Sequence, residues 1–352
     1  MGESDIVVTR LGAMAIFTVV GAGMMGSALC VPLVDRGHEV RLVGTHLDAD
    51  IVAALRDRNH HPKLRHDLPE AIEVFPHTAL SEAMDGAEVL ALGVSSAGVT
   101  WACEQLKPFA SRPTFMITKG LVGKDAGLQI IPDVVGEALG GHPAAIAGPC
   151  IAGELARRVP TCVVVTGRAP ALCRELAALL RTPYYHVSTS EDAVGTEVCA
   201  ALKNAFAMGV AFGAGMHAAS GGEPGSIAMH NVESAVFAQA VVEMRRVIGR
   251  LGGDPLTAAG LAGAGDLDVT NNGGRTGRFG RFLGRGLSRD EAIERMEGAT
   301  LECLGILAVM RPAVRAWKAE EELPLLVHLM EVGLDGAPVA LPFERFFGGA
   351  TG

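Results

Sequence analysis

The sequence of 352 residues lacks the patterns that mark disulfide-stabilised, metal-binding and membrane-spanning proteins. Its seven cysteines are odd in number and form no C-x-x-C pair, so we expect a reduced, cytoplasmic protein without a disulfide framework. It contains no H-E-x-x-H motif and no cluster of His and Cys, and we therefore expect no metal site. We find no apolar run of transmembrane length, which predicts that the chain does not insert into a membrane.

Positive charge is also scarce. Lys and Arg together number 30 against 39 Asp and Glu, which gives a formal net charge of −9. This balance argues against general binding to nucleic acid or to an anionic membrane surface. Hydrophobic residues make up 49% of the chain, enough to bury a large core, and the length predicts two domains.

A glycine-rich motif follows the first apolar run of the chain. The run Ile16–Val20 reads as a strand, and Gly21 to Gly26 then spell G-x-G-x-x-G before a helix. The first glycine permits the tight turn, the second lets the backbone approach a pyrophosphate, and the third lets the helix pack on the strand. The motif therefore predicts a dinucleotide site, whose contacts we assign to Gly21, Gly23, Met24, Met25 and Gly26.

The choice between NAD and NADP stays open in the sequence. After the second strand, at 39–43, the residues that would read the ribose are Gly44, Thr45 and His46. We expect Thr45 to contact the cofactor, but neither an acid nor an Arg is present to select one form. Asp48 comes slightly later, and we interpret it as the cap of a helix over 48–58 rather than as a cofactor ligand.

Further apolar strands at 88–94, 114–118, 144–147 and 161–166 predict an α/β fold, a Rossmann domain with a mostly parallel sheet. Ligands bind beyond the carboxyl ends of such strands, so we place Ser95, Ser96 and Lys119 at the rim of the site. The charged, His-rich segment 56–76 we interpret as a solvated excursion over the surface.

From Ser190 onward the pattern is helical. Lys203 and Asn204 lie in an almost entirely apolar helix, where an ammonium must be paired or must serve as an acid or base. Later, Arg275 follows a glycine-rich stretch, and backbone amides beside an arginine suit a phosphate or carboxylate. We therefore divide the chain into a loose extension (1–14), a Rossmann domain (15–189) and a helical domain for substrate and catalysis (190–352).

Taken together, several segments resemble the NAD(P)-dependent glycerol-3-phosphate dehydrogenases from about Ile16 to Val332. The matching pieces are GAGMMGSAL, ITKGL, AGPCIAGELA, EDAVGTEVCAALKN, GLAGAGDLDVT, GRTGRFGRFLGRG and MEG. The resemblance implies an amino-terminal Rossmann domain, an all-helical carboxy-terminal domain and reversible reduction of dihydroxyacetone phosphate to sn-glycerol 3-phosphate with NAD or NADP.

The resemblance also implies roles for individual residues. Lys203 would be the general acid and base, assisted by Asp266 and Lys119. The other residues implied in binding cofactor or substrate are Gly148, Cys150, Ala152, Asn204, Thr270, Gly274, Arg275, Thr276 and Glu297. A homodimer is expected, because the apolar, glycine-rich helices after Ser190 could form an interface.

Some positions depart from the family pattern. Thr276 stands where the family has Asn beside Arg275, and Glu233 and Gln239 stand where it has basic residues. These departures predict weaker phosphate binding and leave the substrate open among phosphorylated or acidic hydroxy compounds. The alternatives are a related dehydrogenase acting on a 2-keto acid, in the manner of ketopantoate reductase, and a non-catalytic nucleotide-binding module.

Overall fold

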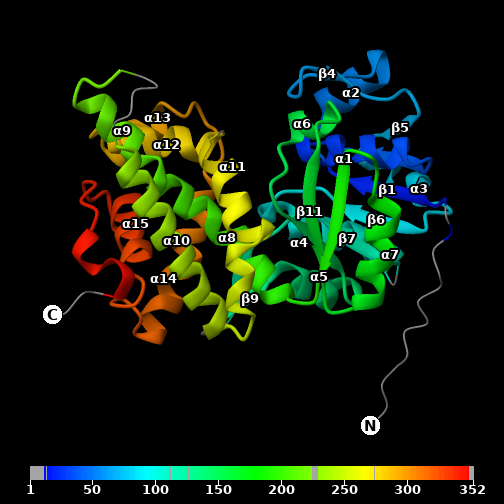
Figure 1. The fold of residues 1–352 in the computed structure, drawn as a ribbon. Helices are drawn as coiled ribbons and strands as arrows, with labels where there is room; N and C mark the ends of the chain where they lie inside the picture. Colours follow the sequence, from blue (N-terminus) through cyan, green and yellow to red (C-terminus); the bar gives the residue numbers. More distant parts are fainter. Residues whose placement is uncertain are drawn as a thin grey trace, which may run out of the picture. The chain divides into compact units, whose positions relative to one another are not determined.

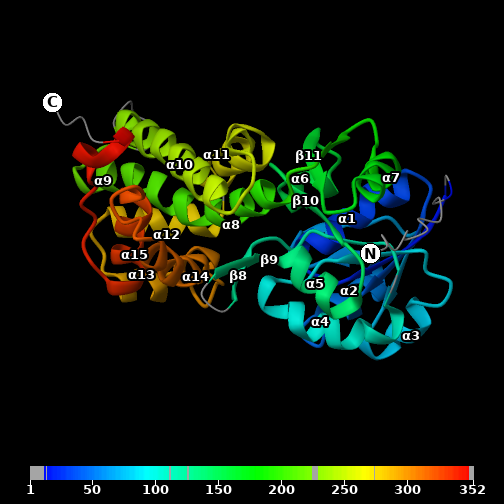
Figure 2. The ribbon, with the colours of Figure 1, turned by 90° about the horizontal axis from the view of Figure 1, so that it is seen from below.

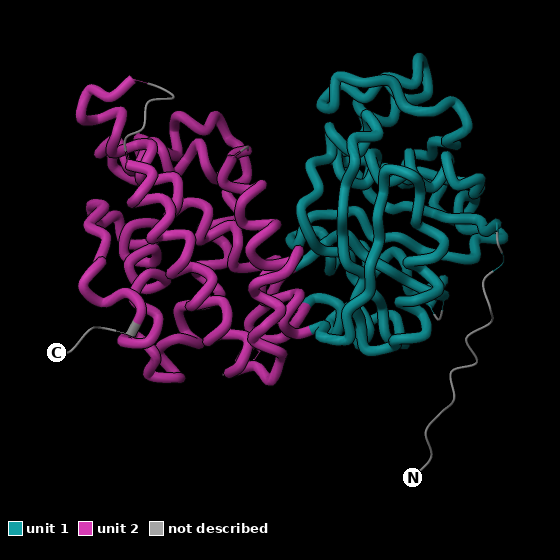
Figure 3. The backbone as a smooth tube through the Cα atoms, in the orientation of Figure 1, with its two compact units in different colours: residues 1–119, 131–193 teal, residues 120–130, 194–352 magenta. Residues whose placement is uncertain are grey.

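The computed structural model describes residues 12, 14–110, 112–124, 127–223, 229–272 and 274–348. The chain divides into two compact units (Figure 3): unit 1 comprises residues 1–119 and 131–193, and unit 2 comprises residues 120–130 and 194–352. The division after residue 193 is close to the boundary expected at 189/190, whereas the segment 120–130 groups with the second unit. The expected extension 1–14 lies almost wholly outside the described residues.

Unit 1 is built around an eight-stranded sheet with the order β12-β11-β10-β7-β6-β1-β2-β5. Every neighbouring pair is parallel except β10 with β11. A mostly parallel Rossmann-type sheet is therefore confirmed. The strands are β1 (Ile16–Val20), β2 (Glu39–Val43), β5 (Ile72–Phe75), β6 (Val89–Leu92), β7 (Thr114–Met116), β10 (Ala144–Ala147), β11 (Thr161–Thr166) and β12 (Tyr185–Ser190).

Helices cover both faces of this sheet, as Figure 2 shows, with α1, α6 and α7 on one face and α3, α4 and α5 on the other. This two-sided cover explains why β6 and β10 are buried along their whole length and read as continuous apolar runs. The helices are α1 (Met24–Asp35), α2 (Ala49–Arg58), α3 (Leu80–Ala83), α4 (Val99–Leu106), α5 (Ile131–Leu139), α6 (Ala152–Ala156) and α7 (Pro170–Leu180), with short 3₁₀ turns η1 (His77–Ala79), η2 (Ser96–Gly98) and η3 (Lys107–Phe109).

The His-rich segment 56–76 is not simply a surface excursion, so that expectation was wrong. Its end forms β5, which pairs with β2 at the edge of the sheet. Its middle forms the small hairpin β3 (His60–His61) with β4 (His66–Asp67), and His61 is fully buried. Charged residues concealed both features, because only alternate side chains of a short strand face the interior.

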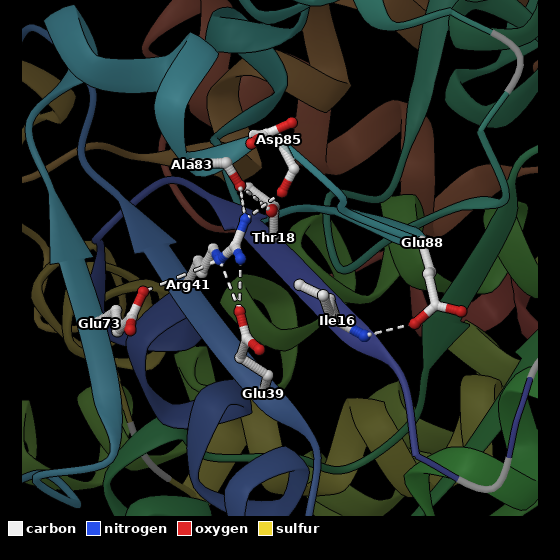
Figure 4. A network of polar contacts seen from close by, with 8 residues as sticks. All are labelled: Ile16, Thr18, Glu39, Arg41, Glu73, Ala83, Asp85 and Glu88. Atoms are coloured by element: carbon white, nitrogen blue, oxygen red, sulfur yellow. Dashed lines mark hydrogen bonds and ion pairs between the residues drawn. The ribbon is translucent and has the colours of Figure 1, made fainter.

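A polar network secures the β2 edge of the sheet (Figure 4). The Arg41 guanidinium on β2 donates to two carbonyl oxygens, that of Ala83, the last residue of α3, and that of Asp85 just after it. Arg41 also forms an ion pair with Glu39. Thr18 on β1 donates to the same Ala83 carbonyl at 2.7 Å. These bonds satisfy the carbonyl groups at the end of the short helix and fix that helix against β1 and β2.

Unit 2 is helical, as expected (Figure 1), apart from a hairpin of β8 (Leu121–Lys124) with β9 (Gly127–Ile130). The first strand of this hairpin contacts α14 (Figure 2). The helices of unit 2 are α8 (Ala193–Val210), α9 (Phe212–Ala219), α10 (His230–Arg250), α11 (Asp266–Asn272), α12 (Arg275–Gly284), α13 (Arg289–Glu294), α14 (Glu302–Trp317) and α15 (Pro324–Asp335), with the short turns η4 (Pro255–Ala259), η5 (Leu261–Gly265) and η6 (Phe343–Gly348).

Glycines allow α12 to lie very close to α8 and α9. A Cβ at Gly280 would stand 2.3 Å from the Met208 carbonyl oxygen, and one at Gly284 would stand 2.3 Å from that of Phe212. Since real side chains do not tolerate such distances, Gly280 and Gly284 are required for this packing. The close approach holds the second half of α12 against α8 and α9.

The segment Ala193–Ala219 corrects another expectation. It is helical, and its mean hydropathy of 1.4 makes it long and apolar enough to cross a membrane by length and composition, although we expected no such run. However, 83% of the apolar window is buried inside the protein. Burial of this kind is typical of a core helix, and Val198, Leu202 and Phe206 on α8 are fully buried.

Candidate functional site

Unit 1 gathers the expected cofactor residues at one edge of its sheet. Because β1, β2, β6, β7 and β10 run parallel, the loops after them meet at their common carboxyl edge. These loops carry the residues predicted from the sequence, namely Gly21 to Met25, Thr45, Ser95, Lys119, Gly148, Cys150 and Ala152. These residues thus lie in loops at one edge of the sheet, and their contacts with a cofactor stay a prediction.

The three glycines of the turn have different physical roles. Gly21 has φ +114°, and a Cβ there would stand 2.7 Å from the Gly93 carbonyl. A Cβ at Gly26 would stand 2.1 Å from the Gly21 oxygen, so this glycine is required for helix packing. At Gly23, by contrast, nothing lies within 4 Å of a Cβ.

The open space at Gly23 fits a bound pyrophosphate. Gly23 is the N-cap of α1, has no side-chain cap bond, and begins the intrahelical bonding as acceptor for Ser27 N–H. The first N–H groups of α1 therefore have no partner within the helix, and the positive end of the helix dipole is at the same place. Backbone without a side chain in front of it admits close approach of phosphate oxygens.

Asp48 does not cap α2 through its side chain, contrary to our interpretation. It occupies the N-cap position, but its Oδ2 accepts hydrogen bonds from the Thr45 N–H and Thr45 hydroxyl, both at 2.8 Å. The same oxygen accepts from the Ala22 N–H at 3.3 Å. Asp48 thus connects the loop after β2 with the glycine-rich turn after β1.

The carbonyl group of Ala22 is held from the other side. His61 Nε2 lies 3.1 Å from the Ala22 oxygen, and the Ser27 hydroxyl donates to that oxygen at 3.1 Å. His61 Nδ1 accepts from the Leu64 N–H at 3.1 Å, which leaves Nε2 as the protonated ring nitrogen. Burial lowers the pKa of His61 and so favours this neutral tautomer.

The remaining rim residues of unit 1 differ in exposure. Ser95 is exposed in the loop after β6, and Lys119 is half-buried three residues beyond the end of β7. Gly148 is buried and has φ +119°, a conformation that favours glycine, directly after β10. Cys150 and Ala152, both half-buried, pack against the core of unit 1 where α6 begins.

In unit 2, Lys203 and Asp266 form an ion pair. Lys203 Nζ on α8 lies 2.5 Å from Asp266 Oδ1, and the side chains are only 12% and 2% exposed. A π-helical turn, η5, immediately precedes Asp266, and a Cβ at Gly263 within it would stand 2.1 Å from the Ala258 carbonyl oxygen. The irregular turn thus depends on glycine, and such turns are frequent at functional sites.

A second polar group lies on neighbouring helices of the same unit. Glu302, the first residue of α14, accepts a hydrogen bond from Asn204 Nδ2 at 3.1 Å. Its other carboxylate oxygen lies 3.6 Å from Arg275 Nη2. The structure therefore brings together Asn204 and Arg275, two of the residues implied in substrate binding, and adds Glu302, which the sequence reasoning did not single out.

The other implied residues lie along α11 and α12. The Thr270 hydroxyl donates to the Asp266 carbonyl oxygen at 2.6 Å, one helical turn earlier. Gly274 is exposed with φ +108° as the N-cap of α12. Thr276 is buried and hydrogen bonds to the Cys303 thiol, so its hydroxyl has a partner within the protein.

Glu297 is exposed and has φ +55°, the left-handed conformation. Of the two departures on α10, Glu233 is half-buried and lies 3.1 Å from His230 Nδ1. Gln239 is fully buried, donating to Glu243 at 2.7 Å and accepting from the Phe347 N–H at 2.9 Å. Gln239 is therefore engaged in holding η6 against α10.

Three polar residues were not assigned a role at these sites from the sequence: Glu302, His61, and Asp48 as a hydrogen-bond partner of the glycine-rich turn. The signal for Asp48 was its place just after β2, in the region where an acid is usual in dinucleotide-binding folds. Neither Glu302 nor His61 belongs to a short motif, so only the folded chain reveals them. Lys119 belongs to unit 1 and Lys203 and Asp266 to unit 2, and the convergence of all three stays a prediction.

Both halves of the chain match models of one family. Residues 16–173 match the NAD-dependent glycerol-3-phosphate dehydrogenase N-terminus, and residues 192–341 match its C-terminus. The NADP(+)-dependent glycerol-3-phosphate dehydrogenase of Archaeoglobus fulgidus is 35% identical over 320 residues, covering 90% of this chain and 93% of that protein. The NAD(P)(+) glycerol-3-phosphate dehydrogenase of Bacillus thuringiensis is 30% identical over 327 residues, covering 91% of each.

Solved structures of glycerol-3-phosphate dehydrogenases are similar to this structure. The glycerol-3-phosphate dehydrogenase of Coxiella burnetii is similar with a TM-score of 0.79 and 25% identity, covering 93% of this chain and 96% of that one. The Saccharomyces cerevisiae enzyme, 22% identical with a TM-score of 0.77, shares the fold. The expected fold, family and use of NAD or NADP are thereby confirmed. The chain belongs to the NAD-dependent glycerol-3-phosphate dehydrogenase family, whose members are NAD(P)-dependent oxidoreductases.

Proposed function

We propose that this chain reduces dihydroxyacetone phosphate to sn-glycerol 3-phosphate, reversibly, with NADH or NADPH. The observation that carries the proposal is the pair of Lys203 with Asp266 in an otherwise apolar part of unit 2. Burying an ammonium costs free energy unless the ammonium is paired. If the pair served only to hold the helices together, apolar side chains of similar size would stabilise them equally well. The curated relatives with this activity support the substrate.

Unit 1 would hold the cofactor at the carboxyl edge of its sheet. Its pyrophosphate would lie against the N–H groups at the start of α1, opposite the open space at Gly23. Thr45 would face the ribose, and Ser95 would border the same edge. When bound, the cofactor supplies or accepts the hydride.

Lys203 would transfer the proton. Reduction of a ketone places negative charge on the carbonyl oxygen, and an ammonium donating to that oxygen stabilises the charge and delivers the proton. Asp266 would keep the ammonium oriented, since its carboxylate lies 2.5 Å from Nζ and is itself almost fully buried. The resemblance predicts that Lys119 assists at the same oxygen.

Arg275 and the start of α12 would bind the phosphate of the substrate. The guanidinium is half-exposed at the positive end of a helix whose first residues are Arg275, Thr276 and Gly277. Because the Thr276 hydroxyl bonds to Cys303, it contributes less to this site than the Asn found in the family. We therefore expect fewer side-chain contacts to phosphate than the family pattern implies.

We also propose that the enzyme works in the cytoplasm as a homodimer. The odd number of cysteines and their lack of a C-x-x-C pair support a reducing compartment. Phe343 and Phe347 remain 43% and 60% exposed, an apolar area that a second copy could cover. The mass of the purified protein by light scattering tests the dimer.

The test of the proposed function is turnover. NADH and NADPH are each offered with dihydroxyacetone phosphate, and ketopantoate serves as the competing substrate. Reduction of dihydroxyacetone phosphate alone supports the proposal, whereas preference for ketopantoate supports the related dehydrogenase. Cofactor binding without turnover of either substrate would support the non-catalytic binding module and overturn the proposal.

A further inference from the structure

Both polar groups of Ala22, in the middle of the glycine-rich turn, are held by side chains from distant segments. The N–H donates to Asp48 Oδ2 at 3.3 Å, and the carbonyl oxygen accepts from His61 Nε2 at 3.1 Å. Asp48 is 26 residues away and His61 is 39 residues away along the chain. Ala22 and His61 are both fully buried.

The geometry of the peptide bond gives these contacts a consequence for ligand binding. In a planar trans peptide, the C=O of one residue and the N–H of the next point in opposite directions. With the Ala22 oxygen held by the buried His61, the Gly23 N–H is turned to the opposite side. Gly23 is only half-buried, and nothing lies within 4 Å of a Cβ built on it, so the backbone here can be approached closely.

We propose that Asp48 and His61 are positioning residues for the cofactor, acting through the Ala22 peptide. They fix the orientation of the turn so that the Gly23 N–H already faces the pyrophosphate before it binds. The inference rests on the proposed function, since it requires that the turn binds a dinucleotide. Neither side chain needs to touch the reacting atoms.

One other side chain, Ser27, also bonds to the Ala22 oxygen, but it fixes the turn less firmly than His61 does. The Ser27 hydroxyl also reaches the Ala22 oxygen at 3.1 Å, but it belongs to α1 and moves with the turn. His61, by contrast, is anchored outside the turn, because its Nδ1 accepts from Leu64 N–H at 3.1 Å. Asp48 is likewise tied to Thr45 by two bonds of 2.8 Å. Asp48 and His61 together connect the glycine-rich turn to the segments that follow β2 and α2.

The test measures binding of NADH, and of ADP-ribose as a ligand that has the pyrophosphate but no nicotinamide. For His61→Leu and for Asp48→Ala we expect the dissociation constants of both ligands to rise about tenfold. KM for NADH should rise with them, while kcat stays within about twofold, because the chemical step lies elsewhere. His61→Gln, which can keep an N–H near the position of Nε2, should recover most of the affinity.

His60 provides a matched control. It lies beside His61 on β3 but is partly exposed, with its ring 2.6 Å from Asp67, so His60→Leu should bind both ligands like the wild type. Circular dichroism identifies variants that fail to fold, and Asp48→Ala then carries the test, because Asp48 is only half-buried. Folded His61→Leu or Asp48→Ala that binds ADP-ribose as tightly as the wild type overturns this inference. Failure of the wild type to bind NADH or NADPH would instead overturn the proposed function.

Discussion

Lys203 and Asp266, 63 residues apart, meet as an ion pair with 2.5 Å between Nζ and Oδ1. Asp266 is 1% exposed as a residue, so its carboxylate is almost fully shielded from solvent. Lys203 retains somewhat more exposure, with 12% of its side chain accessible. The ammonium is thus the more accessible member of the pair.

Replacing Lys203 by Met should abolish turnover while cofactor binding is retained. A positioned proton donor contributes roughly a hundredfold to ten-thousandfold to the rate, and Met keeps much of the volume without the proton. Steady-state turnover of dihydroxyacetone phosphate and NADH binding by fluorescence measure the two effects. Turnover within tenfold of the wild type would show that Lys203 is not the proton donor.

The glycines of the turn can be separated by two alanine variants. Gly26→Ala should lower the melting temperature, because the new Cβ would stand 2.1 Å from the Gly21 oxygen. Gly23→Ala should leave the melting temperature nearly unchanged, since the site is open and φ is −65°, yet it should raise KM for the cofactor severalfold. A large stability loss in Gly23→Ala, or unaltered KM, would refute the assignment of the open space to pyrophosphate.

Glu302 should weaken phosphate binding in the native enzyme. Its carboxylate lies 3.6 Å from Arg275 and takes up part of the positive charge offered to an anion. Both side chains are half-exposed, so the effect is modest, and Glu302→Gln should lower KM for the phosphorylated substrate about two- to fivefold. Glu294→Gln, an exposed change elsewhere in unit 2, is the control. An increased KM in Glu302→Gln would mean that the carboxylate orients Asn204 or Arg275 productively.

Glu243 should make the stability of unit 2 depend on pH. Burial raises the pKa of this carboxyl to about 7, although Gln239 and the Leu325 and Leu326 N–H groups all donate to it and partly oppose the shift. The folded state then binds a proton that the unfolded state releases between pH 4.5 and 7. The free energy of unfolding should therefore fall as the pH rises through this range, by roughly 3 kcal/mol.

Urea denaturation at several pH values measures this dependence. The Glu243→Gln variant removes the titrating group, so its stability should change much less between pH 5 and pH 8. If the wild type and this variant show the same slope, the buried carboxyl is not the source of the dependence.

The sequence predicted those parts of the protein that local patterns encode. The run Ile16–Val20 with the following glycines identified β1 and the turn, since strand period and glycine spacing are properties of neighbouring residues. The strands over 144–147 and 161–166 were found with correct bounds for the same reason. The edge strand β5 was missed, because its charged neighbours obscure the pattern.

What the sequence by itself determined is therefore the fold class, the dinucleotide turn and the family, each carried by short segments in a fixed order. Only the tertiary structure decided which distant side chains meet: Asp266 at Lys203, Glu302 between Asn204 and Arg275, and Asp48 with His61 around Ala22. The physical reason is that such contacts depend on helix packing and loop closure over tens of residues, for which adjacent residues carry no local signal.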